Sequence, residues 1–143
     1  MYMTNIFKDR SIPLRPFERI PWGGSDENLG NYKKEIEYSR KALEINPEYL
    51  DALYNTGVAY GKLGEHNKAI ECYAKALEIH PGDVGAWNNL GWNFGKLGDH
   101  FQEIESYKKA LRIDPNNGFA RKSLEAALVK YPQYHEEKKE KET

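Results

Sequence analysis

The segment DALYNTGVAYGKLGE (51–65) reappears 34 residues later as GAWNNLGWNFGKLGD (85–99), aligned without gaps. The segments that follow them, HNKAIECYAKALEIHP (66–81) and HFQEIESYKKALRIDP (100–115), match in the same register. A third copy of this second half, NYKKEIEYSRKALEINP (31–47), precedes both. Self-similarity at a fixed period of this length is the signature of a stacked repeat architecture.

Within each repeat the apolar residues have helical spacing. Apolar or small side chains recur every three or four residues across 53–63 and again across 69–77, which is the spacing of one helix face. Gly64 and Gly98 stand where a left-handed glycine ends a helix. We therefore predict an all-α chain of about six helices, near 31–45, 48–62, 65–79, 82–96, 99–113 and 116–131.

The helix starts and the helix contacts have sequence signals of their own. Asn46 and Asp114 each precede a proline, so we expect them to be N-caps with the proline at the first helical position. Asp99 begins a sequence with the spacing of a capping box. Gly57 and Gly91 lie on the core face of the first helix of each pair, where a small residue allows close packing of the paired helix.

A set of hallmark residues recurs at equivalent positions of the repeats. They are Trp87, Leu90, Gly91 and Phe94 in one first helix, Leu53, Thr56, Gly57 and Tyr60 in the other, and Ala69 with Tyr73 in a second helix. Together they resemble the tetratricopeptide repeat over residues 30–131. The resemblance implies a short α-solenoid of antiparallel helix pairs, a right-handed superhelix with a concave groove. It also implies a scaffold that binds proteins or peptides and does not catalyse a reaction.

Three residues depart from the pattern of this family. Glu35 and Glu103 replace the small residue that Ala69 provides, and Ser39 replaces an aromatic residue. Glu35 and Ser39 fit a helix whose partner is missing. Glu103 is expected to reach solvent past Phe101 or to splay its helix pair slightly.

The ends of the chain differ from the repeats in composition. Residues 1–24 mix prolines with apolar side chains, which predicts an extended arm that packs on its own domain or binds a groove. Residues 132–143 are a mixed charge run, which predicts a disordered tail. The predicted repeat domain, 25–131, divides into a half repeat at 30–47, full repeats at 50–81 and 84–115, and a capping helix at 116–131.

Composition and motifs exclude several functions. With 21 Lys and Arg against 22 Asp and Glu, the net charge is -1, so nucleic acid is not an expected partner. Cys72 is the one cysteine, which excludes an internal disulfide and a thiolate metal cage. His66 and His100 begin second helices in positions expected to be exposed, and no catalytic arrangement stands out. We therefore expect no enzyme, no cofactor and no metal.

No apolar run is long enough for a signal peptide or a membrane span. We therefore expect a cytoplasmic protein without a membrane partner.

The helix face opposite the core face supplies the candidate site, because in tetratricopeptide pairs that face of the first helices lines the groove. Trp92 either packs across the groove on Tyr54 and Val58 or forms an aromatic floor for a partner. Lysines outnumber acidic residues along this face, which favours an acidic, apolar ligand. The candidate groove residues are Tyr54, Asn55, Val58, Lys62, Asn88, Asn89, Trp92, Lys96, Phe119 and Lys122, followed by Ala126 and Lys130.

Some members of the family hold a C-terminal carboxylate with a clamp of Lys, Asn and Arg residues. Asn55 and Asn89 could match its asparagine. The positions where the clamp needs basic or amide residues hold Tyr54, Val58, Phe119 and Ser123. A chaperone-tail clamp is therefore not expected.

Two functions remain. The first is a non-enzymatic interaction module that binds a peptide or helix of a partner protein in an aromatic, lysine-lined groove. The alternative is a self-associating structural or assembly subunit, which forms a homodimer through its incomplete N-terminal repeat or its arm.

Overall fold

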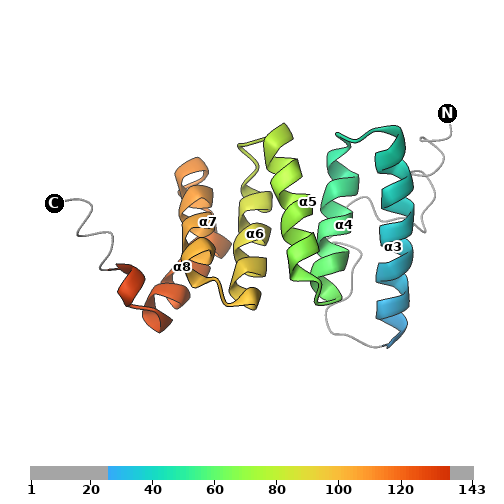
Figure 1. Ribbon diagram of the computed structural model, residues 1–143. Helices are drawn as coiled ribbons and strands as arrows, with labels where there is room; N and C mark the ends of the chain where they lie inside the picture. Colours follow the sequence, from blue (N-terminus) through green and yellow to red (C-terminus); the bar gives the residue numbers. More distant parts are fainter. Residues whose placement is uncertain (1–25, 136–143) are drawn as a thin grey trace. The chain divides into compact units, whose positions relative to one another are not determined.

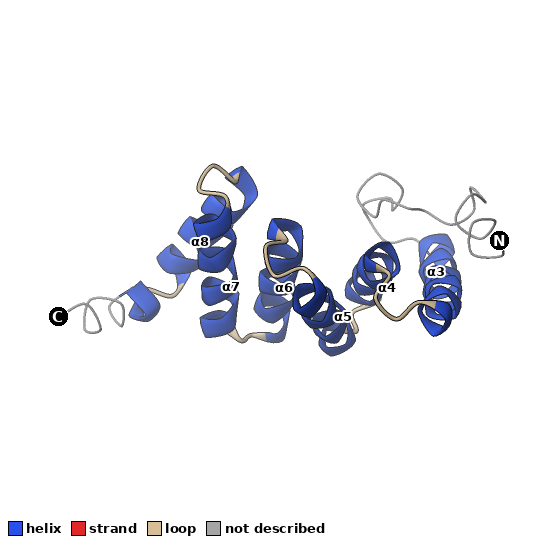
Figure 2. Ribbon diagram, turned by 90° about the horizontal axis from the view of Figure 1, so that it is seen from above, coloured by secondary structure: helices blue, strands red, loops and turns tan. Residues whose placement is uncertain are grey.

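The computed structural model describes residues 26–135, which form helices and no strand (Figure 2). The chain divides into two compact units, Met1–Pro81 and Gly82–Thr143. The helices are α3 (Asp26–Ile45), α4 (Leu50–Lys62) and α5 (His66–Ile79) in the first unit, and α6 (Val84–Leu97), α7 (His100–Ile113) and α8 (Gly118–Lys130) in the second (Figure 1). The prediction of an all-α repeat fold is confirmed. The predicted arm at 1–24 lies outside the described residues, and α3 begins earlier than expected.

In the first unit, α3 packs on α4 and α4 packs on α5. Tyr32 and Ile36 of α3 form one buried cluster with Ala59 of α4, and Val58 packs against it. Tyr73 of α5 is almost completely buried. Burial of such apolar surface is the main stabilising contribution that a short helix has, since isolated helices of this length are marginal in water.

In the second unit, α6 packs on α7 and α7 packs on α8. Leu90 of α6, Ile104 and Tyr107 of α7, and Ala120 of α8 are buried. Two successive hairpins therefore share α7, which holds the unit together from its middle.

The close approach of the paired helices depends on two glycines, as predicted. A Cβ atom added to Gly57 would lie 2.7 Å from Cζ of Tyr73, and one added to Gly91 would lie 2.8 Å from Cε1 of Tyr107. Real side chains do not tolerate such distances, so each tyrosine ring occupies the space that a larger residue would fill.

The predicted N-caps at Asn46 and Asp114 are wrong. The side chains of these two residues accept hydrogen bonds from backbone N–H groups two residues further on, which is the geometry of an Asx turn. The helices begin after the turn: Asp83 caps α6 and Asn117 caps α8 by accepting from the N–H three residues ahead. The prolines therefore lie in the turns and not at the first helical positions.

The predictions for the two helix-ending glycines and for Asp99 agree with the structure. Gly64 and Gly98 have positive φ angles of 83° and 85°, as predicted. The Asp99 side chain accepts from the backbone N–H of Gln102 and so caps α7.

Glu35 and Ser39 do not lie on an exposed face. Their exposed fractions are 6% and 1%, and they share a helix face with Tyr32 and Ile36. That face packs on α4 of the next repeat. The partner expected to be missing is a first helix upstream in the same repeat, and that stretch lies outside the described residues.

The first residues of the expected disordered tail are ordered by aromatic packing. Residues 133–135 form a helical turn. The Tyr134 ring lies 6.1 Å from that of Phe101 and 6.4 Å from that of Tyr131, measured between centroids. The boundary at 132 stays a prediction, and residues 136–143 of the expected tail lie outside the described residues.

None of the described helices has the length and apolar character needed to cross a membrane.

Candidate partner-binding site

A pocket of about 340 Å³ lies within the second unit, between α6, α7 and α8. All three helices of the second unit line this pocket. The lining residues are Trp92, Gly95 and Lys96 of α6, His100, Glu103 and Tyr107 of α7, and Ser123, Ala126, Ala127, Lys130 and Tyr131 from α8 and its end. We call it the α6–α8 pocket.

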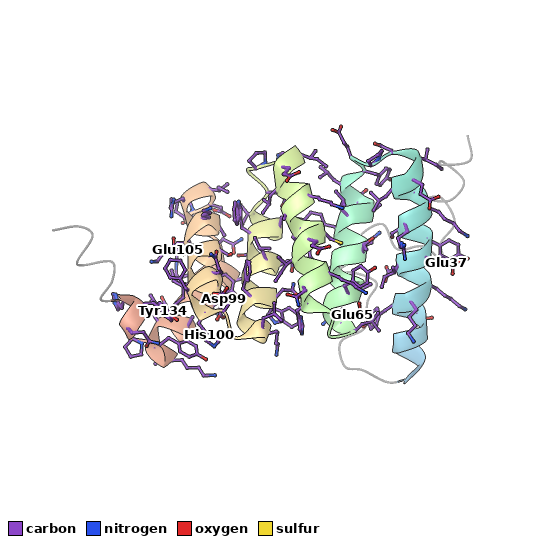
Figure 3. The ribbon with its side chains drawn as sticks, in the orientation of Figure 1. Glu37, Glu65, Asp99, His100, Glu105 and Tyr134 are labelled. Carbon is purple, nitrogen blue, oxygen red and sulfur yellow. The ribbon has the colours of Figure 1, made fainter. Side chains whose placement is uncertain are left out.

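A histidine–glutamate pair lies in the α6–α8 pocket. His100 Nδ1 lies 2.8 Å from Glu103 Oε2, and the two side chains are 22% and 17% exposed. The His100 ring stacks on Tyr131 with centroids 3.7 Å apart. Figure 3 labels His100 beside Asp99 at the start of α7. The expectation that His100 is an exposed polar residue is therefore wrong, because the end of α8 covers its ring.

Gly95 makes the room for Glu103. A Cβ atom at Gly95 would lie 2.7 Å from Cδ of Glu103. The carboxylate therefore packs against the backbone of α6, and it neither reaches past Phe101 nor needs a splayed helix pair. Replacing the alanine of the family pattern with glutamate is compensated by the absence of a side chain opposite.

Tyr107 forms part of the inner wall. Burial, helped by the nearby negative charge of Glu103 and opposed by a hydrogen bond to Ser123, raises the pKa of its hydroxyl to about 12. The hydroxyl is therefore protonated at neutral pH. Its bond to Ser123 links α7 to α8 across the pocket.

Two lysines flank the pocket, and each lies over an aromatic ring. Lys96 Nζ is 5.3 Å from the centroid of a Trp92 ring, and Lys130 Nζ is 5.5 Å from that of Tyr131. These distances are within the range of cation–π attraction. The rings hold the ammonium groups close to the pocket, which gives it a positive rim around one internal carboxylate.

The predicted groove residues of the second unit fall in different places. Trp92 and Lys96 line the α6–α8 pocket. Asn88 is buried, and its Nδ2 donates to Asn117 Oδ1 at 3.1 Å, which joins α6 to the start of α8. Phe119 and Lys122 are exposed on α8, and Asn89 is partly buried.

The remaining predicted groove residues lie on α4 in the first unit. The Tyr54 ring meets the Tyr73 ring edge to face at 5.6 Å. Asn55 is completely buried, whereas Val58 and Lys62 are partly buried. The predicted groove as a whole joins residues of both units and stays a prediction.

Seven lining residues are not among the predicted groove residues: Gly95, His100, Glu103, Tyr107, Ser123, Ala127 and Tyr131. One signal for the pair was present, since His100 and Glu103 are three residues apart on a helix, a spacing that allows their side chains to meet. No local signal indicates that Tyr131, after the end of α8, stacks on His100.

Within residues 26–135, no three His, Cys, Asp or Glu side chains gather in a way that could hold a metal ion. Cys72 is partly buried, and burial raises the pKa of its thiol to about 11, the opposite of what an active thiolate needs.

Comparison with known proteins assigns the family. Models of the tetratricopeptide repeat match residues 27–49, 50–83 and 84–117. These segments are contiguous and make up more than half of the chain. The chain belongs to the tetratricopeptide repeat family. The comparison with curated proteins gives no match.

Three solved structures illustrate the similarity of fold. The Sgt2 domain from Aspergillus fumigatus is 28% identical with a TM-score of 0.68, covering 75% of this chain and 72% of that one. The first such domain of Spaghetti (RPAP3), bound to the HSP90 peptide SRMEEVD, is 21% identical with a TM-score of 0.66, covering 71% and 80%. A MamA RS-1 double mutant is 23% identical with a TM-score of 0.67; the match covers 77% of this chain but 64% of the MamA chain.

Proposed function

We propose that this chain is a non-enzymatic interaction module that binds a peptide or helix of a partner protein, with the α6–α8 pocket as an anchoring point in the predicted groove. The observation that carries the proposal is a concave site with aromatic walls and a lysine rim. Interface cores are enriched in such aromatic side chains, and a few of them supply most of the binding free energy.

The charges around the pocket favour an acidic, apolar ligand. Lys96 and Lys130 stand at the rim, and Lys122 follows on the exposed surface of α8. Electrostatic complementarity of this kind speeds association and excludes basic partners. The proposal includes a cytoplasmic location, and it includes neither nucleic acid nor a membrane as a partner.

The peptide bound by the Spaghetti domain supports peptide binding by this fold, but a different mode is expected here. Tyr54, Val58, Phe119 and Ser123 occupy the positions where a carboxylate clamp needs basic or amide groups. A terminal carboxylate is therefore not the expected anchor.

A selection from a displayed random peptide library on the full chain tests the proposal. Enriched peptides should contain acidic and aromatic or aliphatic residues. Trp92→Ala should weaken their binding by about 2 kcal/mol or more, the loss of a buried aromatic anchor, while the helical circular dichroism signal is retained.

Tyr38→Ala is the matched control, because Tyr38 is an exposed ring of the first unit that also carries a lysine, with Lys41 Nζ 5.9 Å from its centroid. This variant should bind as the parent chain does. If Trp92→Ala binds the peptides with unchanged affinity, the pocket is not the site.

The alternative, self-association, draws on two large apolar side chains exposed on α3, Tyr38 and Ile45. Sedimentation velocity decides between the two functions. A concentration-dependent dimer that Ile45→Glu dissociates would favour the assembly subunit, and a monomer would favour the interaction module.

A further inference from the structure

The α6–α8 pocket contains one carboxylate among aromatic rings. Glu103 Oε2 contacts His100 Nδ1, and no other hydrogen bond to this carboxylate occurs among residues 26–135. An ionised carboxylate offers about four lone-pair sites on its two oxygens. Glu103 therefore has acceptor capacity left for a hydrogen-bond donor that enters the pocket.

The rim decides which donors fit. Lys96 and Lys130 place positive charge at the entrance, and His100 already faces Glu103. A lysine or arginine side chain would have to pass both ammonium groups to reach the carboxylate. A neutral donor meets no such repulsion, and acidic groups beside it would be attracted to the rim.

The residues that line the pocket indicate which kind of side chain it can hold. Trp92, Tyr107 and Tyr131 supply aromatic surface, and the small side chain of Ala126 takes up little of the space between them. Ligand pockets span roughly 300–1,000 Å³, so a pocket of about 340 Å³ has room for a single large side chain. Aromatic rings in edge or offset contact gain stabilisation beyond their buried area.

We propose that the α6–α8 pocket binds one tyrosine side chain of an acidic peptide segment, whose hydroxyl donates to Glu103 while neighbouring Asp or Glu side chains pair with Lys96 and Lys130. This inference rests on the proposed function and specifies its ligand. It assigns a role to Glu103, the residue that departs from the alanine of the family pattern at this position.

Two synthetic peptides test the inference on the full chain: acetylated, fluorescein-labelled Glu-Glu-Tyr-Glu-Glu and the same peptide with Phe in place of Tyr. Fluorescence anisotropy should show the Phe peptide binding at least about tenfold more weakly, since a hydrogen bond to a charged group is lost. In Glu103→Ala the two peptides should bind within about threefold of each other. In Glu105→Ala, which removes a carboxylate of α7 outside the pocket, the preference for Tyr should persist.

Two further peptides separate other ligand chemistries. A phosphotyrosine peptide should bind more weakly than the Tyr peptide, because the phosphate brings negative charge towards Glu103. A peptide with Lys in place of Tyr should also bind more weakly, because the rim repels it. Tighter binding of either one would overturn the inference in favour of phosphate or cation recognition.

The inference is also overturned if Tyr and Phe peptides bind equally well to the parent chain, if the preference survives in Glu103→Ala, or if neither peptide binds. The proposed function is judged separately, by whether library-selected peptides lose affinity in Trp92→Ala. Selected peptides that depend on Trp92 but ignore Glu103 would leave the interaction module standing and remove the tyrosine assignment.

Discussion

The hairpins α4–α5 and α6–α7 have the same repeat sequence plan, yet they differ at the position that gives the α6–α8 pocket its carboxylate. Both pack a tyrosine against a glycine, Tyr73 on Gly57 and Tyr107 on Gly91. At the next equivalent position, the first hairpin has a fully buried alanine, Ala69, and the second has Glu103.

The difference indicates how one residue can change the chemistry between two paired helices. The shared glycine–tyrosine contact maintains the helix spacing in both hairpins. The second hairpin has glutamate in place of alanine, and Gly95 leaves room for this side chain on the facing helix. The glutamate provides a hydrogen-bond acceptor inside the pocket, and α8 forms the remaining side of that pocket.

The largest expected effect tests what the hairpins share. Gly57→Val and Gly91→Val should each destabilise the chain by about 3 kcal/mol, because the added atoms have no space beside the tyrosine rings. Gly118→Ala is the control, since a Cβ atom there meets nothing within 4 Å. Urea unfolding measures all three, and a mild effect of either valine would mean that its hairpin relaxes easily.

The second prediction exchanges the residue that distinguishes the hairpins. Ala69→Glu should cost about 2 kcal/mol or more, because it buries a carboxylate where the native residue is fully enclosed. Glu103→Ala should change the free energy of unfolding by less than about 1 kcal/mol, since loss of a partly buried charge offsets the lost pair. Chemical denaturation of both variants provides the comparison. If glutamate is tolerated equally well in both hairpins, either repeat can accommodate a carboxylate at this position.

The third prediction concerns alkaline pH. Burial raises the pKa of both Tyr73 and Tyr107 above the ordinary value of 10.0, to about 12 for Tyr107. A tyrosine whose pKa is higher in the folded state stabilises the fold fully below pH 10, and that contribution is lost as the pH rises towards 12. Tyr107→Phe should therefore reduce the loss of stability between pH 10 and 12, by an amount on the order of 1 kcal/mol.

Thermal melts at stepped pH measure this effect, and Tyr38→Phe is the exposed control. If Tyr107→Phe and the parent chain lose stability in parallel above pH 10, the hydroxyl of Tyr107 ionises as easily in the folded chain as in the unfolded one.

The smallest expected effect concerns the helix starts, where the hairpins also differ. Asp99 caps α7 through its side chain, whereas Glu65, at the equivalent position before α5, makes no side-chain cap and instead pairs with Lys68. Figure 3 labels both acidic residues. Asp99→Ala should cost about 1 kcal/mol. Glu65→Ala should cost only a few tenths of a kcal/mol, because an exposed ion pair contributes little. Equal losses in thermal melts would contradict the difference in capping.

Much of the fold could be predicted because its signals are local or periodic. The 34-residue spacing, the glycines at 57 and 91, and the left-handed glycines at 64 and 98 each depend on near neighbours in the chain. The N-cap prediction fails because the side-chain oxygen of Asn46 or Asp114 can accept either in an Asx turn or in a helix cap. The turn continues beyond the proline in both places, so the oxygen accepts in the Asx turn. Of the groove residues, Trp92 and Lys96 are found together in the α6–α8 pocket, whereas Asn55 and Asn88 are buried.

The sequence by itself therefore determined the class of fold, the helix count within the repeats and the face that carries Trp92, because helical periodicity places residues on faces without knowledge of the neighbours. The tertiary structure alone decided that Glu103 finds room over Gly95, that Tyr131 closes over His100 and that Tyr107 bonds to Ser123. These contacts join residues from different helices, and the distances between helices depend on the packing of every side chain between them.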